Sequence, residues 1–380
     1  MKICAVICEY NPFHNGHLYQ LKEAKRLSGA DAILCIMSGN FVQRGEAAVA
    51  DKFTRAKHAV LGGADIVLEL PTLFATSNAE LFAKGAISIL SEIPAVTTLC
   101  FGAETDDKAA FLQAASLFNN EPEEISQKIK ELTAEGVSYA KARAEAWKNV
   151  LPIEILTSPN NILGLEYTRA ILAKNADIDI LPIQRIGGGY NDTEIKEEFS
   201  SASAIRAAIS TGKDIENTLP EFVLNDLPKQ LSDKLDCLEK YAILSRNEKD
   251  IAQVCDCTEG LENAFKKAAL LEDSLADSLT SARYTSSRIR RIALQNLLKI
   301  DETLIRQSLQ SPLYLRVLAV KKTSTEALSA LADASLPIIA RAHDEDALLG
   351  VAKQAYELDR FADSVYSLLY SPANNRTIFV

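Results

Sequence analysis

Over its first 215 residues, this 380-residue chain alternates short apolar runs with helical stretches, and this alternation limits the folds that it can adopt. The runs are too short for core helices and show no polar alternation, so they predict strands that are buried on both faces. Joining such strands through helices requires a parallel sheet that is covered on both sides. The strands are expected at Ile3–Cys8, Ala32–Met37, Ile66–Leu70, Thr97–Phe101 and Ile178–Ile183.

Apolar residues at helical spacing predict the intervening helices. These are expected at His17–Leu27, Phe53–Leu61, Ala79–Leu90 and from about Ser203. Between about residues 107 and 150 the pattern is only helical, which predicts an insertion between strands. After about Gly212 no strand pattern returns, so residues 216–380 are expected to form an all-helical domain behind an α/β domain of residues 1–215.

The composition is that of a globular protein, with 47% hydrophobic and 24% charged residues. The net charge of −10 argues against a general nucleic-acid coat but leaves room for a local basic patch. The seven cysteines, an odd number, are predicted to be reduced, and Cys255 and Cys257 lack partner cysteines at metal-binding spacing. With no secretory leader pattern and no run of about 18 apolar residues, a cytoplasmic protein without a membrane span is expected.

The most informative segment follows the first strand and opens the first helix: Glu9–His17, which ends in His14-Asn15-Gly16-His17. Ligands of open α/β sheets sit at the carboxyl ends of the strands, and a helix start favours an anion. Gly16 lets the backbone approach closely, and imidazole N–H groups donate to phosphate oxygens. A zinc half-site is the less favoured alternative because no third ligand follows at suitable spacing. No Walker-type phosphate loop occurs.

A second motif, Ser201–Arg206 (SASAIR), lies at the start of the helix after the last predicted strand. Its arginine has the planar fork that suits phosphate oxygens. The two motifs together resemble those of the HxGH nucleotidyltransferase superfamily. This chain carries Ala202 and Ser203 where many members of the superfamily carry Ser and Thr.

The resemblance extends over essentially the whole chain to one family, the bacterial tRNA(Met) cytidine acetate ligases. It implies a doubly wound nucleotidyltransferase domain of the HIGH type and a helical tRNA-binding domain. It also implies activation of acetate by ATP to acetyl-adenylate, followed by acetylation of N4 of the wobble cytidine of elongator tRNA(Met). The chemistry of the triphosphate, rather than the resemblance, adds Mg²⁺ as an expected cofactor. The blocks that carry it are Glu9–His17, Ser38–Glu46, Ala64–Asn78, Ser158–Tyr167, Arg185–Asp192, Glu259–Asn263 and Arg283–Arg291.

The resemblance also implies the site residues. His14, His17 and Arg206 are expected to be catalytic. Some of the expected ATP-binding residues also have structural explanations. Gly102 can belong to a turn at the end of a strand, Asn160 or Asn161 can cap a helix, and Arg185 can precede a flexible loop. The expected ATP-binding residues are Ile7, Cys8, Glu9, Tyr10, Asn11, Pro12, Phe13, His14, Asn15, Gly16, His17, Leu18, Tyr19, Gln20, Gly102, Asn160, Asn161, Arg185, Ser201, Ser203 and Arg206.

Four polar residues after the second strand lie where the ligand crevice is expected: Gln43, Arg44, Asp51 and Lys52. They are candidates for contacts with acetate, phosphate or cytidine, and Asp51 for a magnesium ligand. A solvated loop explains them nearly as well.

Charge indicates a nucleic-acid partner. Residues 281–322 carry nine basic and two acidic side chains, a net charge of +7 in an acidic protein. Tyr284 and Tyr314 lie in this segment as candidates for stacking on unpaired bases. The alternative is a basic face that is paired with acidic neighbours. The residues expected to bind tRNA are Arg283, Arg288, Arg290 and Arg291.

Two other functions remain open at this point. An adenylyltransferase that joins AMP to a small phosphate-bearing substrate shares the nucleotide motifs but does not need the basic segment. An RNA-binding protein whose nucleotide site only senses a ligand is the second alternative, and the intact motifs argue against it.

Overall fold

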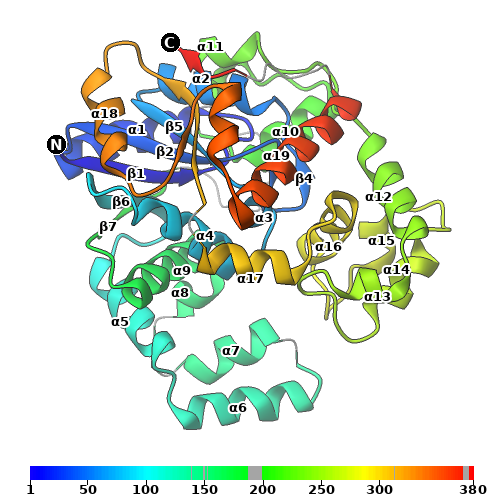
Figure 1. Cartoon of the computed structure of the whole chain (residues 1–380). Coiled ribbons are helices and arrows are strands. Elements are labelled where there is room, and N and C mark those ends of the chain that lie inside the picture. The colour runs from blue at the N-terminus through cyan, green and yellow to red at the C-terminus, as the bar shows by residue number, and fades with distance from the viewer. Residues whose placement is uncertain (138, 149, 152, 187–198, 312, 371–375) are drawn as a thin grey trace.

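The computed structural model describes residues 1–137, 139–148, 150–151, 153–186, 199–311, 313–370 and 376–380. Its centre is an eight-stranded sheet with the strand order β10-β8-β5-β2-β1-β6-β7, and β9 pairs with β8 (Figure 1). A separate two-stranded hairpin consists of β3 and β4. The strands are β1 Ile3–Cys8, β2 Ala32–Ser38, β3 Phe41–Val42, β4 Glu46–Ala47, β5 Ile66–Leu70, β6 Val96–Ala103, β7 Asp179–Gln184, β8 Leu315–Val320, β9 Ile338–Ile339 and β10 Ile378–Phe379.

The five predicted strands are confirmed, and they run parallel to one another. Alternate residues of β1 belong to different cores: Ile3 and Ala5 pack on one face of the sheet, and Cys4 and Val6 on the other. The expectation of strands buried on both faces is therefore confirmed for β1, β2 and β5, whereas the edge strand β7 has exposed residues at both ends. The chain moves outward from β1 through β2 to β5 and then crosses to β6 on the opposite side of β1. This reversal places a topological switch point between β1 and β6.

Helices cover both faces of the sheet (Figure 1). One core includes residues of α1 Asn15–Ser28, α2 Lys52–Leu61, α10 Ala202–Thr211 and α11 Glu221–Leu224. The opposite core includes residues of α3 Thr72–Ala75, α4 Ala79–Leu90, α5 Lys108–Asn119, α8 Ile153–Thr157, α9 Pro159–Lys174, α17 Glu302–Gln310, α18 Thr325–Ala330 and α19 Gly350–Leu369. Short 3-10 helices lie at Glu216–Thr218, Leu331–Asp333 and Ala342–Ala347.

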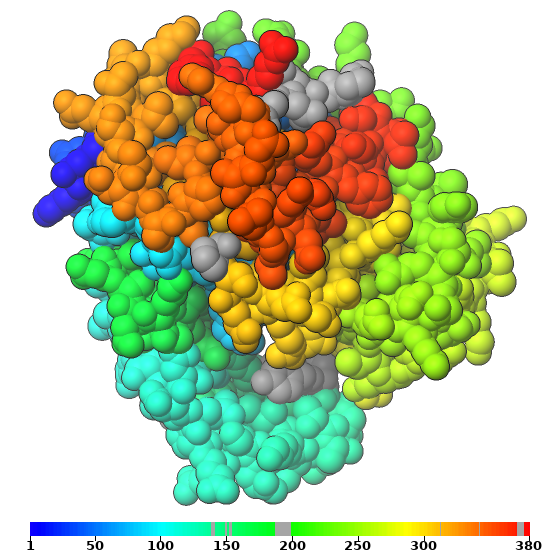
Figure 2. Space-filling model, viewed as in Figure 1, coloured from blue at the N-terminus to red at the C-terminus, as the bar shows by residue number. Residues whose placement is uncertain are grey.

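Two helical groups have small cores of their own. The predicted insertion contains α6 Glu123–Ala134 and α7 Tyr139–Trp147, which form a separate lobe (cyan-green, bottom of Figure 2). The second group forms the yellow-green lobe on the right of Figure 2 and gives the helical C-terminal region that was expected. It comprises α12 Lys234–Ser245, α13 Glu248–Ala252, α14 Leu261–Ala268, α15 Leu275–Leu279 and α16 Ser286–Leu298.

The expectation that no strand follows Gly212 is wrong. β8 joins the central sheet antiparallel to β5, and β10 pairs with β8. Helix α19 then packs on α3 and α17 beside this sheet. The sequence concealed β8 because Arg316 interrupts its apolar run, and two lysines follow it. The division of the chain at residue 215 stays a prediction, but residues 315–320 belong to the sheet of the first part.

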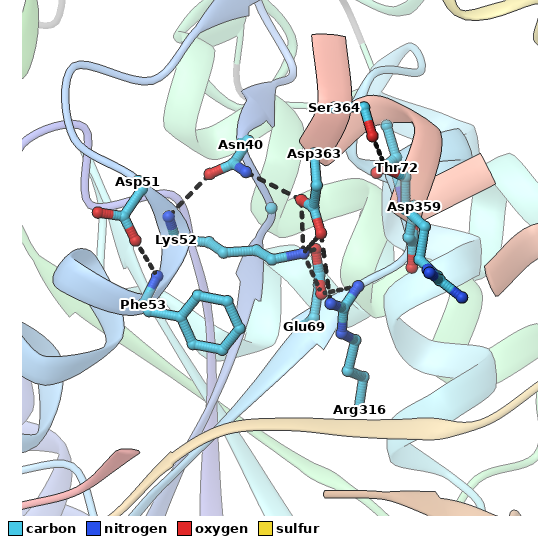
Figure 3. A network of polar contacts seen from close by, with 12 residues as sticks. Asn40, Asp51, Lys52, Phe53, Glu69, Thr72, Arg316, Asp359, Asp363 and Ser364 are labelled. Carbon is cyan, nitrogen blue, oxygen red and sulfur yellow. Dashed lines mark hydrogen bonds and ion pairs between the residues drawn. The ribbon is translucent and has the colours of Figure 1, made fainter. Parts of the chain in front are cut away.

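Arg316 is accommodated in the buried strand β8 because it belongs to a network of buried charged side chains (Figure 3). Arg316 pairs with Glu69 at 3.1 Å and with Asp363 of α19 at 3.3 Å. Lys52 Nζ lies 2.8 Å from Glu69 and 2.7 Å from Asp363, and its side chain is fully buried. Burial raises the pKa of Glu69 to about 7. The interpretation of Lys52 as a ligand-binding residue is therefore wrong. Its ion pairs connect α2 with β5 and α19.

The cysteines and the longest helices bear on two further expectations, the absence of disulfides and the absence of a membrane span. All seven cysteines are free, as predicted, and Cys4, Cys8 and Cys35 are buried. Within the part of the chain that the structure describes, no helix combines the length and the apolar character that a membrane crossing requires.

Candidate nucleotide site

A cavity of about 170 Å³ lies at the carboxyl ends of β1 and β6, where the switch point predicts a ligand. It brings together both sequence motifs, which are about 190 residues apart in the chain. A much larger cavity of about 790 Å³ lies beside β8 and α19 and contains no motif residue, so chemistry rather than volume identifies the site. The predicted residues that line the site are Ile7, Cys8, Glu9, Tyr10, Asn11, His14, His17, Gln20, Gly102, Asn160, Arg185, Ser201, Ser203 and Arg206.

The two histidines form the start of helix α1. His14 is its N-cap, and its Nδ1 accepts a hydrogen bond from the backbone of Gly16 at 3.1 Å. His17 Nδ1 accepts from the backbone of His14 at 3.2 Å, and the two rings stack with centroids 3.6 Å apart. Because each Nδ1 is an acceptor, the proton of a neutral ring lies on Nε2.

Both histidines are neutral at pH 7. Burial and the nearby Arg185 and Arg206 lower the pKa of His14 to about 3. Burial, His14 and Arg185 lower the pKa of His17 well below its ordinary value. Two neutral Nε2–H donors at a helix N-terminus form a site that favours phosphate oxygens.

The pKa of His14 predicts an acid-sensitive fold. Between about pH 6.5 and pH 3 the unfolded chain binds a proton at His14 that the folded chain does not, so stability falls as the pH falls. His14→Asn keeps a good N-cap without a titrating group. Urea unfolding at about pH 7.5 and about pH 5.5 should show a larger loss for the wild type than for His14→Asn. Equal losses would contradict the assignment of a depressed pKa.

Positive charge surrounds the histidines. Arg206 Nη1 donates to the carbonyl of Asn11 at 2.9 Å, and its Nη2 lies 3.3 Å from Glu46. Arg185 and Arg44 line the same cavity. Burial raises the pKa of Glu9, whose carboxylate accepts a 2.7 Å hydrogen bond from the backbone of Gln43. The cavity thus has three arginines with which to neutralise an anion.

Other predicted residues lie outside this cavity. Asn161 is fully buried, and its Oδ1 accepts from the backbone of Glu104, so it supports the loop after β6. Gly16 and Tyr19 line a small neighbouring cavity that shares the histidines. The remaining predicted residues, Pro12, Phe13, Asn15 and Leu18, line neither. The glycine run 187–189, which follows Arg185 closely in the sequence, lies outside the described residues.

Sequence reasoning missed an apolar wall of the cavity. It is formed by Val42, Phe82, Phe101, Leu163 and Tyr167, from elements on both sides of the switch point. In the sequence these residues look like ordinary core positions, and most of them are indeed buried. The packing of α9 on β6 and of α4 on α9 brings Phe82, Phe101 and Tyr167 together at the site.

The four polar residues after β2 divide into two pairs. Gln43 and Arg44 line the cavity. Asp51 instead caps α2, accepting from the backbone of Phe53 at 2.9 Å. Among the described residues, no group of three His, Cys, Asp or Glu side chains is arranged to hold a metal ion.

The four arginines that are expected to bind tRNA contact other groups of the protein, whereas a free RNA-binding face would leave them exposed to the ligand. Arg283 pairs with Glu259 at 2.8 Å, and Arg288 donates to the carbonyl of Asp256 at 2.7 Å. Arg290 pairs with Glu46, and Arg291 with Asp256 at 3.8 Å. Pairing with acidic side chains, the alternative for this segment, is thus present for Arg283, Arg290 and Arg291, whereas Arg288 donates to the backbone of Asp256.

The two tyrosines of the segment differ. Tyr314 is fully buried and donates a 2.6 Å hydrogen bond to Asp359, so its interpretation as a base-stacking residue is wrong. Tyr284 stays partly accessible beside Arg283 and Arg288.

Comparison with known proteins assigns the chain to a class. A family model described as HIGH Nucleotidyl Transferase matches residues 1–378. The tRNA(Met) cytidine acetate ligase of Clostridium perfringens (strain SM101 / Type A) is 40% identical over 351 residues, 86% of each chain. That of Thermoanaerobacter sp. (strain X514) is 37% identical over 97% of this chain and 96% of its own. The chain therefore belongs to the HIGH nucleotidyl transferases and, among them, to the tRNA(Met) cytidine acetate ligase family.

Solved structures agree with this assignment. The apo crystal structure of Thermotoga maritima TmcAL matches with a TM-score of 0.92 at 31% identity, over the full length of both chains. The TmcAL structure bound with alpha-thio ATP matches with a TM-score of 0.88 over 99% of this chain and 96% of that one.

Proposed function

We propose that this chain is a tRNA(Met) cytidine acetate ligase. In the first step an oxygen of acetate attacks the α-phosphorus of ATP, diphosphate leaves, and acetyl-adenylate forms. In the second step N4 of the wobble cytidine of elongator tRNA(Met) attacks the acetyl carbon, AMP leaves, and the amine loses a proton. The observation that carries this proposal is the convergence of the HNGH and SASAIR motifs on one cavity in a chain of this family.

The geometry supports roles for three side chains in the first step. The Nε2–H groups of His14 and His17 donate to phosphate oxygens as negative charge develops on the leaving diphosphate. Arg206, at the opposite motif, neutralises the same charge with its fork of donors. Mg²⁺ accompanies the triphosphate in this proposal and would supply further charge neutralisation, held by phosphate oxygens.

The test is exchange of labelled diphosphate into ATP in the absence of tRNA. The ligase catalyses exchange that depends on acetate. An adenylyltransferase requires a different acceptor, and an RNA-binding protein with a sensor site catalyses no exchange. Exchange that does not respond to acetate would contradict the proposal.

For tRNA, the proposal retains the basic segment and makes a narrower prediction. Arg283→Ala combined with Arg288→Ala should weaken tRNA binding and reduce the slope of log affinity against log salt by about 2, because two fewer phosphates are neutralised. These two arginines are chosen because their partners, Glu259 and Asp256, do not line the nucleotide cavity. Binding to tRNA at two salt concentrations and the melting temperature are measured together.

An unchanged affinity and salt slope in a folded double variant would assign tRNA recognition to other surfaces. A lower melting temperature with unchanged affinity would make the arginines structural. A cytoplasmic location is part of the same proposal.

A further inference from the structure

A carboxylate outside the sequence motifs connects the nucleotide cavity with helix α16. Glu46, in the β3–β4 hairpin, has one oxygen 3.3 Å from Arg206 Nη2 and the other paired with Arg290 Nη1. The Glu46 side chain is 23% exposed and that of Arg206 15%. One acidic group is thus shared by the arginine of the SASAIR motif and an arginine of α16.

The hairpin itself is tightly packed against α16. Gly45 has φ +72°, and a Cβ at this position would lie 2.5 Å from the backbone of Arg290 and Arg291. A larger residue would therefore push the hairpin away from the helix. The same hairpin connection carries Gln43 and Arg44, which line the cavity.

The contacts of Arg206 show what Glu46 does for it. The carbonyl of Asn11 holds Nη1 and Glu46 holds Nη2, so the guanidinium is fixed from two sides. An arginine has five N–H donors, and these two contacts leave others to face a phosphate. Holding a long side chain in place before the ligand arrives removes an entropic cost from binding.

We propose that Glu46 is a positioning residue for nucleotide binding, and that Arg290 acts through it rather than on RNA. Arg290 anchors Glu46 to α16, and Glu46 orients Arg206 toward the phosphates of ATP. This inference rests on the proposed function only in taking ATP as the nucleotide. It assigns the helical lobe a part in the first step, before any tRNA is present.

The test is the affinity for ATP, measured by calorimetry on the full chain without acetate or tRNA. Glu46→Gln keeps the shape of the side chain and removes its charge. It should weaken ATP binding about tenfold, a small effect for the loss of a charge-assisted hydrogen bond, because the pair is partly exposed to solvent. Arg290→Ala should weaken it about threefold, although Arg290 does not line the cavity. The double variant should bind no more weakly than Glu46→Gln alone, because both changes break one chain of contacts.

A matched pair of controls comes from α19 and from the 3-10 helix Ala342–Ala347 that precedes it. Glu345 and Arg360 form a 2.8 Å ion pair with side chains 30% and 60% exposed, away from the nucleotide cavity. Glu345→Gln and Arg360→Ala should leave ATP affinity within about twofold of the wild type, consistent with the small effect of a surface pair. Melting temperatures are recorded for all variants, because a purely structural role for Glu46 would lower its melting temperature without a selective effect on ATP.

Three results would overturn the proposal. Unchanged ATP affinity in Glu46→Gln removes Glu46 from nucleotide binding. Tighter binding shows that Glu46 competes with phosphate for Arg206. Additive losses in the double variant show that Arg290 acts independently of Glu46. Since calorimetry needs no acetate, a wild-type protein that binds ATP but fails in acetate-dependent exchange contradicts the proposed function and leaves this test intact.

Discussion

Replacing His17 with alanine is expected to slow acetyl-adenylate formation by about 10²–10³-fold, the usual cost of one transition-state hydrogen-bond donor. The neutral ring is held by the backbone of His14 and by stacking, so its Nε2–H is fixed in the cavity before ATP arrives. The effect should appear in the maximal rate of acetate-dependent exchange more than in ATP affinity, because the donor acts as charge develops.

His17 also has a structural task, so alanine alone leaves an ambiguity. Its Nδ1 closes the capping box of α1, and its ring packs against Tyr10 at 4.8 Å. His17→Gln places at this position the residue that normally closes a capping box, without the imidazole donor. A glutamine variant with wild-type melting temperature and an exchange rate as low as that of alanine supports catalysis. Near-normal exchange in either folded variant would remove His17 from the chemistry.

Lys52→Met should lower the free energy of unfolding by about 3–5 kcal/mol, the cost of leaving buried charges without a partner. Lys52 faces Glu69 and Asp363 in the network of Figure 3, and among the described residues Arg316 is the cation that still pairs with both after the change. Urea unfolding of the variant and the wild type at pH 7 measures the loss.

The same helix provides the control. Lys57 pairs with Asp226 at 3.1 Å, but the two side chains are 43% and 30% exposed. Lys57→Met should cost less than about 1 kcal/mol. If Lys52 bound acetate instead, its variant would keep wild-type stability and raise the KM for acetate. That outcome would support a role for Lys52 in ligand binding and contradict its structural role.

Local sequence patterns predict the parallel sheet and the position of its ligand site. The runs Ile3–Cys8 and Ile66–Leu70 are apolar on both faces, and burial of such strands between helices follows from local pattern alone. The HNGH and SASAIR motifs each occur at a strand-to-helix turn, and parallel strands bring their carboxyl ends to one edge. The nucleotide site was therefore predictable without knowing any distant contact.

The roles of the charged residues depend on contacts between distant segments, which the folded structure reveals. Lys52 and Asp363 lie 311 positions apart, and Glu46 meets Arg206 and Arg290 from two distant segments. A lysine after a strand looks the same in sequence whether it faces solvent, a phosphate or a buried carboxylate. Its role depends on desolvation and on the partner that the fold brings to it, and neither is a local property of the chain. β8 was missed for the same reason, because its arginine becomes compatible with a buried strand only beside Glu69 and Asp363.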